Sequence, residues 1–111
     1  MNNKIMKNIA AAEVMALKEL VNYQDGQIVS KTLVQNANVS ITLFAFDKAE
    51  EISTHSSHGD AMVCVLDGTA EIIIADEKFK LMEGQTIVMP AEIPHAVYAL
   101  EKMKFILTVV F

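Results

Sequence analysis

From residue 27 onward, the chain consists of short segments rich in β-branched and aromatic residues, separated at close intervals by turn residues. This spacing is typical of an all-β sandwich or barrel. A chain of 111 residues can bury a core but leaves no room for a second independent domain. The pattern therefore predicts one barrel over residues 27–111, with strands at 28–33, 39–46, 52–55, 61–66, 69–75, 78–82, 86–89, 95–100 and 105–111.

Residues 1–26 are predicted to form a short N-terminal extension. Ile5, Ile9 and the alanines at 10–12 are compatible with one or two helical turns, and residues 17–21 with either a helix end or an edge strand. Lysines precede this stretch, but Glu13 and Lys18 interrupt its apolar part before a signal-peptide core can form. We therefore expect no export signal.

The pair Asp67-Gly68 is the strongest turn signal, because a two-residue mirror-image turn needs positive φ at both centres, which this pair tolerates. It predicts a tight hairpin between the flanking strands. Residues 76–77 and 83–84 are weaker turn signals of the same sort, and the prolines that bound residues 90–94 place a loop there.

Two of the predicted strands are apolar on both faces. Residues 61–66 show no alternation, and residues 105–111 are nearly as continuous, so both faces of each strand must be covered. One face would point into the barrel. The other needs either the N-terminal extension or a partner subunit, and exposed apolar patches usually mark interfaces, so we expect a homodimer.

The charged residues argue against several classes of partner. All nine basic residues are lysine, against 14 acidic residues, which gives a net charge of −5. Nucleic-acid binding needs a basic face and commonly arginine, so neither nucleic acid nor an anionic membrane surface is an expected partner. The longest all-apolar run, residues 61–66, is far shorter than a membrane span.

The single cysteine, Cys64, excludes an intramolecular disulfide and any CxxC motif. Its apolar neighbours predict a small buried hydrophobic side chain. Together with the expected lack of an export signal, this favours a cytoplasmic protein.

The chain contains three histidines, His55, His58 and His95, and imidazole is the commonest metal ligand. The sequence EISTHSSHGDA at 51–61, followed after six residues by Gly68, resembles the first signature of the cupin superfamily. Residues 84–95, in which a glycine, a proline and His95 recur at the right spacing, resemble the second signature. The resemblance implies a small double-stranded β-helix, the jelly-roll-like barrel of RmlC-like cupins, many of which are dimers.

The resemblance also implies that His55 and His95 converge at the barrel mouth, on strands that face one another across it. In metal-binding cupins the first signature supplies two histidines and a glutamate at even offsets, which places them on one face of a strand. Here Ser57 and Ala61 stand at the places of the second histidine and the glutamate. Glu92 stands where a glycine is usual and Ala99 where asparagine is frequent.

The resemblance implies that a divalent metal, if one binds, is zinc, nickel, manganese or iron at His55 and His95, with His58 as a third candidate ligand; the alternative is a barrel without metal. His58 lies at an odd offset from His55, so only a bulge or loop can turn it inward. Such an open site is of the catalytic kind, and an acid from Glu92 or Asp60 would suit non-haem iron. Asp60 has a simpler alternative, which is to cap a turn.

Tyr98 is predicted to lie near the barrel mouth, where its hydroxyl would orient a ligand, or else to pack in the core with its hydroxyl satisfied. Three functions follow from these features. The first is a cupin that binds a small molecule in an apolar barrel with His55 and His95 as polar anchors. The second is a metal-dependent dioxygenase or isomerase, and the third a non-catalytic dimeric interaction or regulatory protein.

Overall fold

The computed structural model describes residues 5–111, which form nine β-strands and one 3-10 turn. Every predicted strand is present, with ends that move by two residues at most. The all-β prediction is therefore confirmed. The elements are η1 (Leu17–Leu20), β1 (Ile28–Gln35), β2 (Val39–Phe46), β3 (Glu51–His55), β4 (Asp60–Asp67), β5 (Thr69–Ile74), β6 (Glu77–Met82), β7 (Thr86–Met89), β8 (His95–Ala99) and β9 (Met103–Val110).

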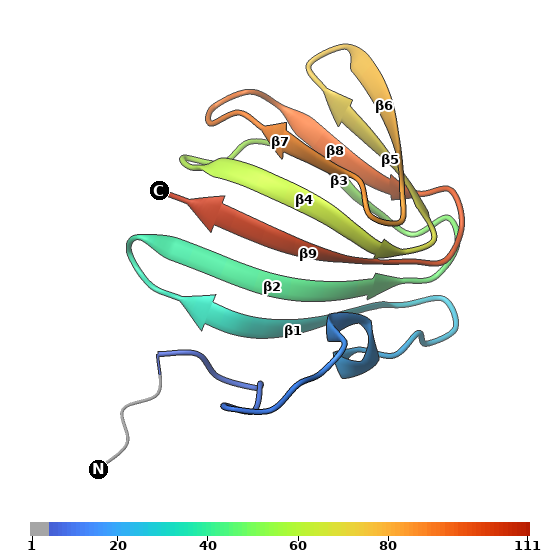
Figure 1. Cartoon of the computed structure of the whole chain (residues 1–111). Helices are drawn as coiled ribbons and strands as arrows, with labels where there is room; N and C mark the ends of the chain where they lie inside the picture. The colour runs from blue at the N-terminus through green and yellow to red at the C-terminus, as the bar shows by residue number, and fades with distance from the viewer. Residues whose placement is uncertain (1–4) are drawn as a thin grey trace.

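The strands form two antiparallel sheets that lie face to face (Figure 1). The larger sheet has the order β1-β2-β9-β4-β7 and the smaller sheet the order β3-β8-β5-β6. Most neighbours in each sheet are far apart in the chain, as β9 is from both β2 and β4. This arrangement is the expected double-stranded β-helix of jelly-roll type.

The main core fills the space between the sheets. Along β4, Ala61, Val63 and Val65 are almost fully buried, whereas Met62 between them is 41% exposed, as strand alternation requires. The ring of Phe105 stacks on Phe44 and meets Phe46 edge-on, which closes the middle of the barrel. The cluster of buried residues comprises Phe46, Ala61, Val63, Val65, Ala70, Ile72, Leu81, Met89, Val97, Ala99, Met103, Phe105 and Val109.

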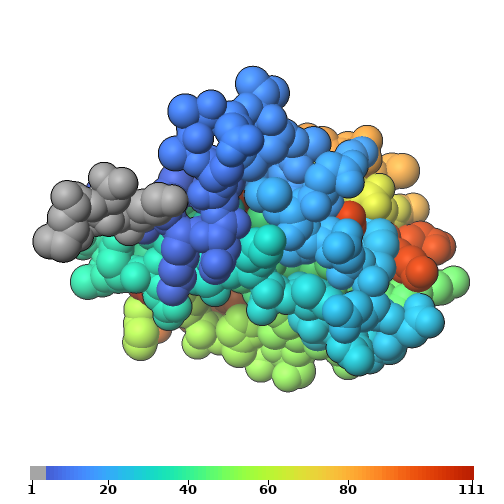
Figure 2. All heavy atoms as spheres, turned by 90° about the horizontal axis from the view of Figure 1, so that it is seen from below, coloured from blue at the N-terminus to red at the C-terminus, as the bar shows by residue number. Residues whose placement is uncertain are grey.

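A second apolar cluster covers the outer face of the larger sheet. The N-terminal extension packs against β1 and β2 there, and Figure 2 shows this segment in blue against the neighbouring strand residues in cyan. Ile9, Leu17, Leu20, Val21 and Tyr23 meet a surface that includes Leu33, Val34, Leu43 and Ala45. The extension thus covers one part of the doubly apolar sheet. On β4 and β7 of the same sheet, away from the extension, the cross-strand partners Met62 and Val88 are 41% and 49% exposed.

Polar contacts fasten the extension to the barrel. The hydroxyl of Tyr23 donates a hydrogen bond of 2.6 Å to Asp67, and the ammonium of Lys104 donates one of 2.6 Å to the carbonyl of Lys18. The Lys104 ammonium also lies 5.0 Å from the centre of the Tyr23 ring, a cation–π distance. Burial, the hydrogen bond to Asp67 and the charge of Asp67 all raise the pKa of Tyr23, so its hydroxyl stays protonated and keeps donating.

The extension differs in part from the sequence expectation. Residues 5–12 form bends rather than helical turns, because Asn8 and Ala12 adopt positive φ angles of 60° and 58°. Here the backbone amide of Lys7 and the side-chain amide of Asn8 donate to the carbonyls of Leu33 and Thr32, which draws this segment against β1. Of the two alternatives at 17–21, the structure has a turn of helix. Among the described residues, no helix is long and apolar enough to cross a membrane.

The prediction of a tight hairpin at Asp67-Gly68 is wrong. The strands on either side, β4 and β5, belong to different sheets and do not pair, so the glycine forms a corner between the sheets. Gly68 has φ of +76°, and a Cβ added there would collide with the carbonyl oxygen of Lys102. The tight hairpin lies instead between β5 and β6, where Ile74 pairs with Glu77 and Ala75 takes a positive φ of 54°.

This corner makes Gly68→Ala strongly destabilising. The substitution combines left-handed backbone strain with a steric clash, so we expect the free energy of unfolding to fall by about 2 to 4 kcal/mol in urea titrations. Gly84→Ala is the matched control, because Gly84 has φ of +85° with nothing within 4 Å of the added Cβ. We expect Gly84→Ala to lower the free energy of unfolding by only about 1 kcal/mol, which is the cost of the backbone strain alone. Equal losses for the two variants would show that close packing of the corner is unimportant.

Candidate functional site

A cavity of about 350 Å³ lies between the two sheets at one end of the barrel. Its volume is in the range of small-molecule sites. Its walls are mainly apolar, and its polar groups gather at the mouth, where β3 leads into β4 and β8 begins. The lining residues are Ile52, His55, Ser56, Ser57, His58, Ala61, Met89, His95, Val97, Phe105, Leu107, Val109 and Phe111.

The structure brings His55 and His95 into direct contact. The two residues are cross-strand partners on β3 and β8, and their Nε2 atoms lie 3.2 Å apart. Their ring centres are 4.4 Å apart at an interplanar angle of 72°. The histidines thus meet as neighbours within the smaller sheet, whereas the resemblance implied strands that face one another across the mouth. A register shift between Ile52 and His55 sets the end of β3 beside the start of β8.

Backbone carbonyls fix the tautomer of both rings. Nδ1 of His55 lies 2.9 Å from the carbonyl oxygen of Ser53, and Nδ1 of His95 lies 3.1 Å from that of Ile93. A carbonyl oxygen only accepts, so each Nδ1 carries the proton and donates it. In neutral rings of this tautomer both Nε2 atoms are unprotonated, and they lie 3.2 Å apart.

The two rings differ in their access to solvent. His95 is only 2% exposed and is the one buried polar residue of the described chain, whereas His55 is exposed. Burial lowers the pKa of His95 below its ordinary value of 6.5, and the nearby His55 lowers it further, although the hydrogen bond to Ile93 acts in the opposite direction. His95 is therefore held as the neutral imidazole, the form that binds a metal ion.

Two bare nitrogens at this distance fit a divalent metal ion. Ligand nitrogens about 2.0–2.1 Å from such an ion lie roughly 3 Å from each other when they occupy neighbouring positions. Carbonyl acceptors behind the ligating rings are also the usual outer partners of metal-bound histidines. Within residues 5–111, however, no three side chains of His, Cys, Asp or Glu come together in a group that could hold a metal. The described chain therefore supplies two ligands with suitable spacing, one fewer than the three protein ligands of an open catalytic zinc site.

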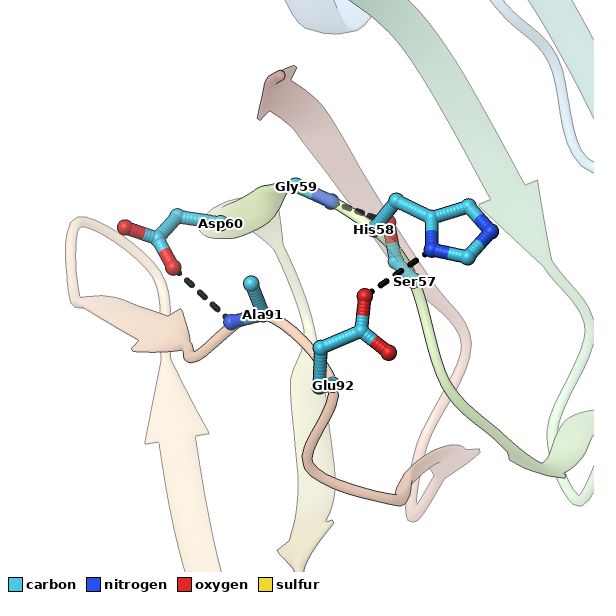
Figure 3. Close-up of polar contacts among 6 residues, drawn as sticks. All are labelled: Ser57, His58, Gly59, Asp60, Ala91 and Glu92. Carbon is cyan, nitrogen blue, oxygen red and sulfur yellow. Dashed lines mark hydrogen bonds and ion pairs between the residues drawn. The ribbon is translucent and has the colours of Figure 1, made fainter.

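His58 lies at the rim of the cavity, on the loop between β3 and β4. Its side chain is 92% exposed, and its Nδ1 is 2.9 Å from Oε1 of Glu92 (Figure 3). The loop expected to turn this ring inward thus exists, but it directs the ring to Glu92. The structure does not bring His58 together with His55 and His95 as a third ligand.

The same rim is held by contacts between two loops (Figure 3). The backbone amide of Glu92 donates to the carbonyl of Ser57 over 2.8 Å, and the amide of Ala91 donates to the carboxylate of Asp60 over 2.8 Å. Asp60 therefore accepts from a backbone amide of the loop after β7, whereas the sequence predicted that it would cap the turn next to Gly59. Glu92 adopts a left-handed φ of 67° at the position where the cupin signature usually has glycine. Neither acid lines the cavity.

The structure does not place Tyr98 in the cavity. His95 and Val97 on β8 line it, so the alternation of side chains directs Tyr98 to the opposite face of the smaller sheet. There Tyr98 pairs in register with Glu51 of β3 and Glu71 of β5. Tyr98 is thus not among the residues that line this cavity, and a role of its hydroxyl in orienting a ligand stays a prediction. The cavity wall of Met89, Leu107 and Phe111 was not predicted from the sequence, although the period of two along β7 and β9 indicates it.

The family model described as a cupin domain matches residues 42–111, which include the histidine pair and every residue that lines the cavity. The chain belongs to the cupin family. This cupin is 49% identical to a conserved protein of unknown function from Streptococcus pyogenes, with a TM-score of 0.95 over 97% of this chain and 95% of that one. Among curated proteins, none matches.

Two further solved structures support the same relationship. A cupin superfamily protein from Desulfitobacterium hafniense is 27% identical, with a TM-score of 0.91 over 96% of this chain and 97% of that one. A cupin barrel domain protein from Leptotrichia buccalis is 42% identical, with a TM-score of 0.84 over 86% of this chain and 46% of that one. These likenesses establish the family and the fold of the cupin, whereas its chemistry depends on the cavity.

The buried position of His95 predicts a pH-dependent stability. In metal-free protein, the unfolded chain takes up a proton near the ordinary pKa of about 6.5, whereas folded His95 takes it up only at lower pH. The free energy of unfolding should therefore fall as the pH is lowered through about 6.5, and level off below the folded pKa. Urea titrations in the presence of a chelator between about pH 7.5 and pH 5 measure this slope.

His95→Gln should remove this part of the pH dependence, whatever it does to the stability itself. His58→Gln is the control, because it makes the same substitution at a histidine whose side chain is 92% exposed on the rim loop. The same slope in His95→Gln and the parent protein would contradict the assignment.

Proposed function

We propose that this cupin binds a small, mainly apolar molecule in its barrel, next to a divalent metal ion held by His55 and His95. The observation that carries the proposal is the pair of bare Nε2 atoms, 3.2 Å apart, at the mouth of an apolar cavity. An apolar pocket with a few convergent polar groups is the usual form of a ligand site. Zinc, nickel, manganese and iron are the candidate metals, because all of them accept imidazole ligands.

Different parts of the chain would orient the metal ligands and contact the apolar molecule. The carbonyls of Ser53 and Ile93 hold the two rings in the ligating tautomer, so little reorganisation is needed when an ion arrives. Phe105 and the aliphatic side chains beside it exclude water from the interior and supply apolar contact area for a ligand. A bound divalent ion would add a Lewis acid at the mouth.

A metal-dependent enzyme of dioxygenase or isomerase type is the second candidate function. The favouring observation is that the chain offers only two ligands, which leaves positions around an ion for a substrate oxygen or water. Iron in the purified protein, together with oxygen uptake during substrate screening, would favour the enzyme. A barrel that binds apolar molecules without turnover would favour the binding protein.

The first test is elemental analysis of the purified, untagged protein beside the double variant His55→Ala, His95→Ala. We expect near-stoichiometric metal in the parent protein and none in the variant, because both Nε2 ligands are lost. In calorimetric titrations with Zn²⁺, either single substitution should weaken binding by more than about 100-fold. Acidification below about pH 6 should release the ion, because protonated imidazoles do not bind metals.

His58→Ala is the matched control for this test. Since the His58 ring contacts Glu92, its loss should change Zn²⁺ affinity by less than about threefold. A loss as large as that of His55→Ala would make His58 a third ligand. Absence of metal from the parent protein, with no binding of Zn²⁺ on addition, would refute the metal part of the proposal.

We further propose that the cupin is a cytoplasmic homodimer. The single free Cys64 favours a reducing compartment. The outer face of the larger sheet keeps an apolar surface that the N-terminal extension leaves open, with Met62, Val88 and Val110 exposed by 41%, 49% and 58%. A second copy would remove this surface from water, which is also the arrangement that a non-catalytic dimeric regulator would use.

Sedimentation analysis tests the dimer. Met62→Glu places a charge in the centre of the exposed surface and should shift the protein from dimer to monomer at micromolar concentration. Met82→Glu is the control, because Met82 is 53% exposed on β6 of the other sheet and should leave the dimer intact. A monomeric parent protein would refute the proposal.

A further inference from the structure

The cavity wall is rich in side chains that carry a ring. The chain has only ten such side chains, from five phenylalanines, two tyrosines and three histidines. Half of these ten belong to the 13 residues that line this one cavity, and they are His55, His58, His95, Phe105 and Phe111. A wall of this composition differs from an aliphatic one, because rings interact with another ring beyond the simple burial of apolar area.

Two phenylalanines stand at opposite ends of this wall. Phe105, Leu107, Val109 and Phe111 all line the cavity, so the alternation along β9 continues past its end and forms one apolar strip on the inner face. Phe105 is fully buried, whereas Phe111 is 56% exposed. The strip therefore leads from the closed interior at Phe105 to the open mouth at Phe111.

The backbone of Phe111 is fixed, although more than half of the residue is exposed. Its amide donates to the carbonyl of Asn38 over 3.0 Å, and the preceding Val110 pairs with both β2 and β4. The loop after β3 packs against the same strand end, since a Cβ added at Gly59 would collide with the carbonyl oxygen of Val110. The strand end thus presents an apolar ring at the entrance of the cavity.

We propose that the cavity selects ligands with an aromatic ring, and that Phe111 contacts the bound ligand at the mouth. The ligand ring would lie in the cavity between Phe105 and Phe111. This inference rests on the proposed binding function and narrows it to one class of ligand. It does not depend on a metal ion.

Physical chemistry distinguishes an aromatic ligand from a saturated one of the same skeleton. Burial of apolar area alone favours the saturated ring, because that ring has slightly more apolar surface. A contact between two aromatic rings adds roughly two- to tenfold in affinity beyond this burial. The order of the two affinities therefore shows whether the rings of the wall act as rings or only as apolar surface.

The test compares benzyl alcohol with cyclohexylmethanol, which share one skeleton and one hydroxyl group and differ only in the ring. Each alcohol is titrated into the isotopically labelled protein, and NMR measures the affinity and identifies the backbone amides whose signals shift. We expect benzyl alcohol to bind at least about threefold more tightly than cyclohexylmethanol. The shifted signals should include those of the cavity wall.

Phe111→Leu tests the ring at the mouth, because leucine keeps an apolar contact and removes the aromatic one. We expect this variant to reduce the preference for benzyl alcohol at least about twofold. Val110→Ala is the matched control, since Val110 is 58% exposed at the same strand end but belongs to the outer face, and it should leave the preference unchanged. Thermal melting first establishes that each variant is folded.

The outcomes separate the inference from the proposed function. If cyclohexylmethanol binds as tightly as benzyl alcohol or more tightly, the cavity is a ligand site and the inference about the ring is overturned. An unchanged preference in folded Phe111→Leu overturns the role of Phe111, and the two alcohols on the parent protein decide if the variant does not fold. If neither alcohol binds to the parent protein, the proposed binding function fails together with the inference.

Discussion

The larger sheet is apolar on both faces, and the rest of the structure depends on how each face is kept from water. The inner face meets the smaller sheet and forms the core around Phe46 and Phe105. The outer face meets the N-terminal extension, which lies across β1 and β2 and is held by the Tyr23–Asp67 hydrogen bond. Because hydrophobic burial is the largest favourable contribution to folding, a barrel of this size needs both layers.

The cavity occupies the end of the barrel where this packing stops. Three strands of the larger sheet contribute its apolar wall, and the smaller sheet contributes the two histidines. Antiparallel pairing places His55 directly opposite His95, and two backbone carbonyls then hold the rings with their unprotonated nitrogens inward. The rim is closed separately by contacts between the loops that follow β3 and β7. Rigid strands therefore position the polar anchor, whereas loop contacts shape the entrance.

The ring contacts also explain why the histidines are not equivalent. His95 is enclosed by the barrel, and its burial favours the neutral form, while His58 stands in solvent beside an acid. The odd offset of His58 from His55 already set it apart in the sequence, but the sequence did not show which way its ring points. The difference arises from the loop at residues 56–59, which directs His58 away from the pair, and from the pairing of β3 with β8.

Local patterns in the sequence determined the nine strands, the turn near Gly84 and the loop between Pro90 and Pro94, because alternation and turn chemistry act over a few neighbouring residues. The two signatures further identified His55 and His95 as a pair. Only the tertiary structure decided which strands pair, and so it replaced the hairpin at Asp67-Gly68 with a corner between sheets. It also turned Tyr98 outward and left the cavity without an acid. These features depend on contacts between residues that are distant in the chain, and local patterns do not specify which distant strands become neighbours in a sheet.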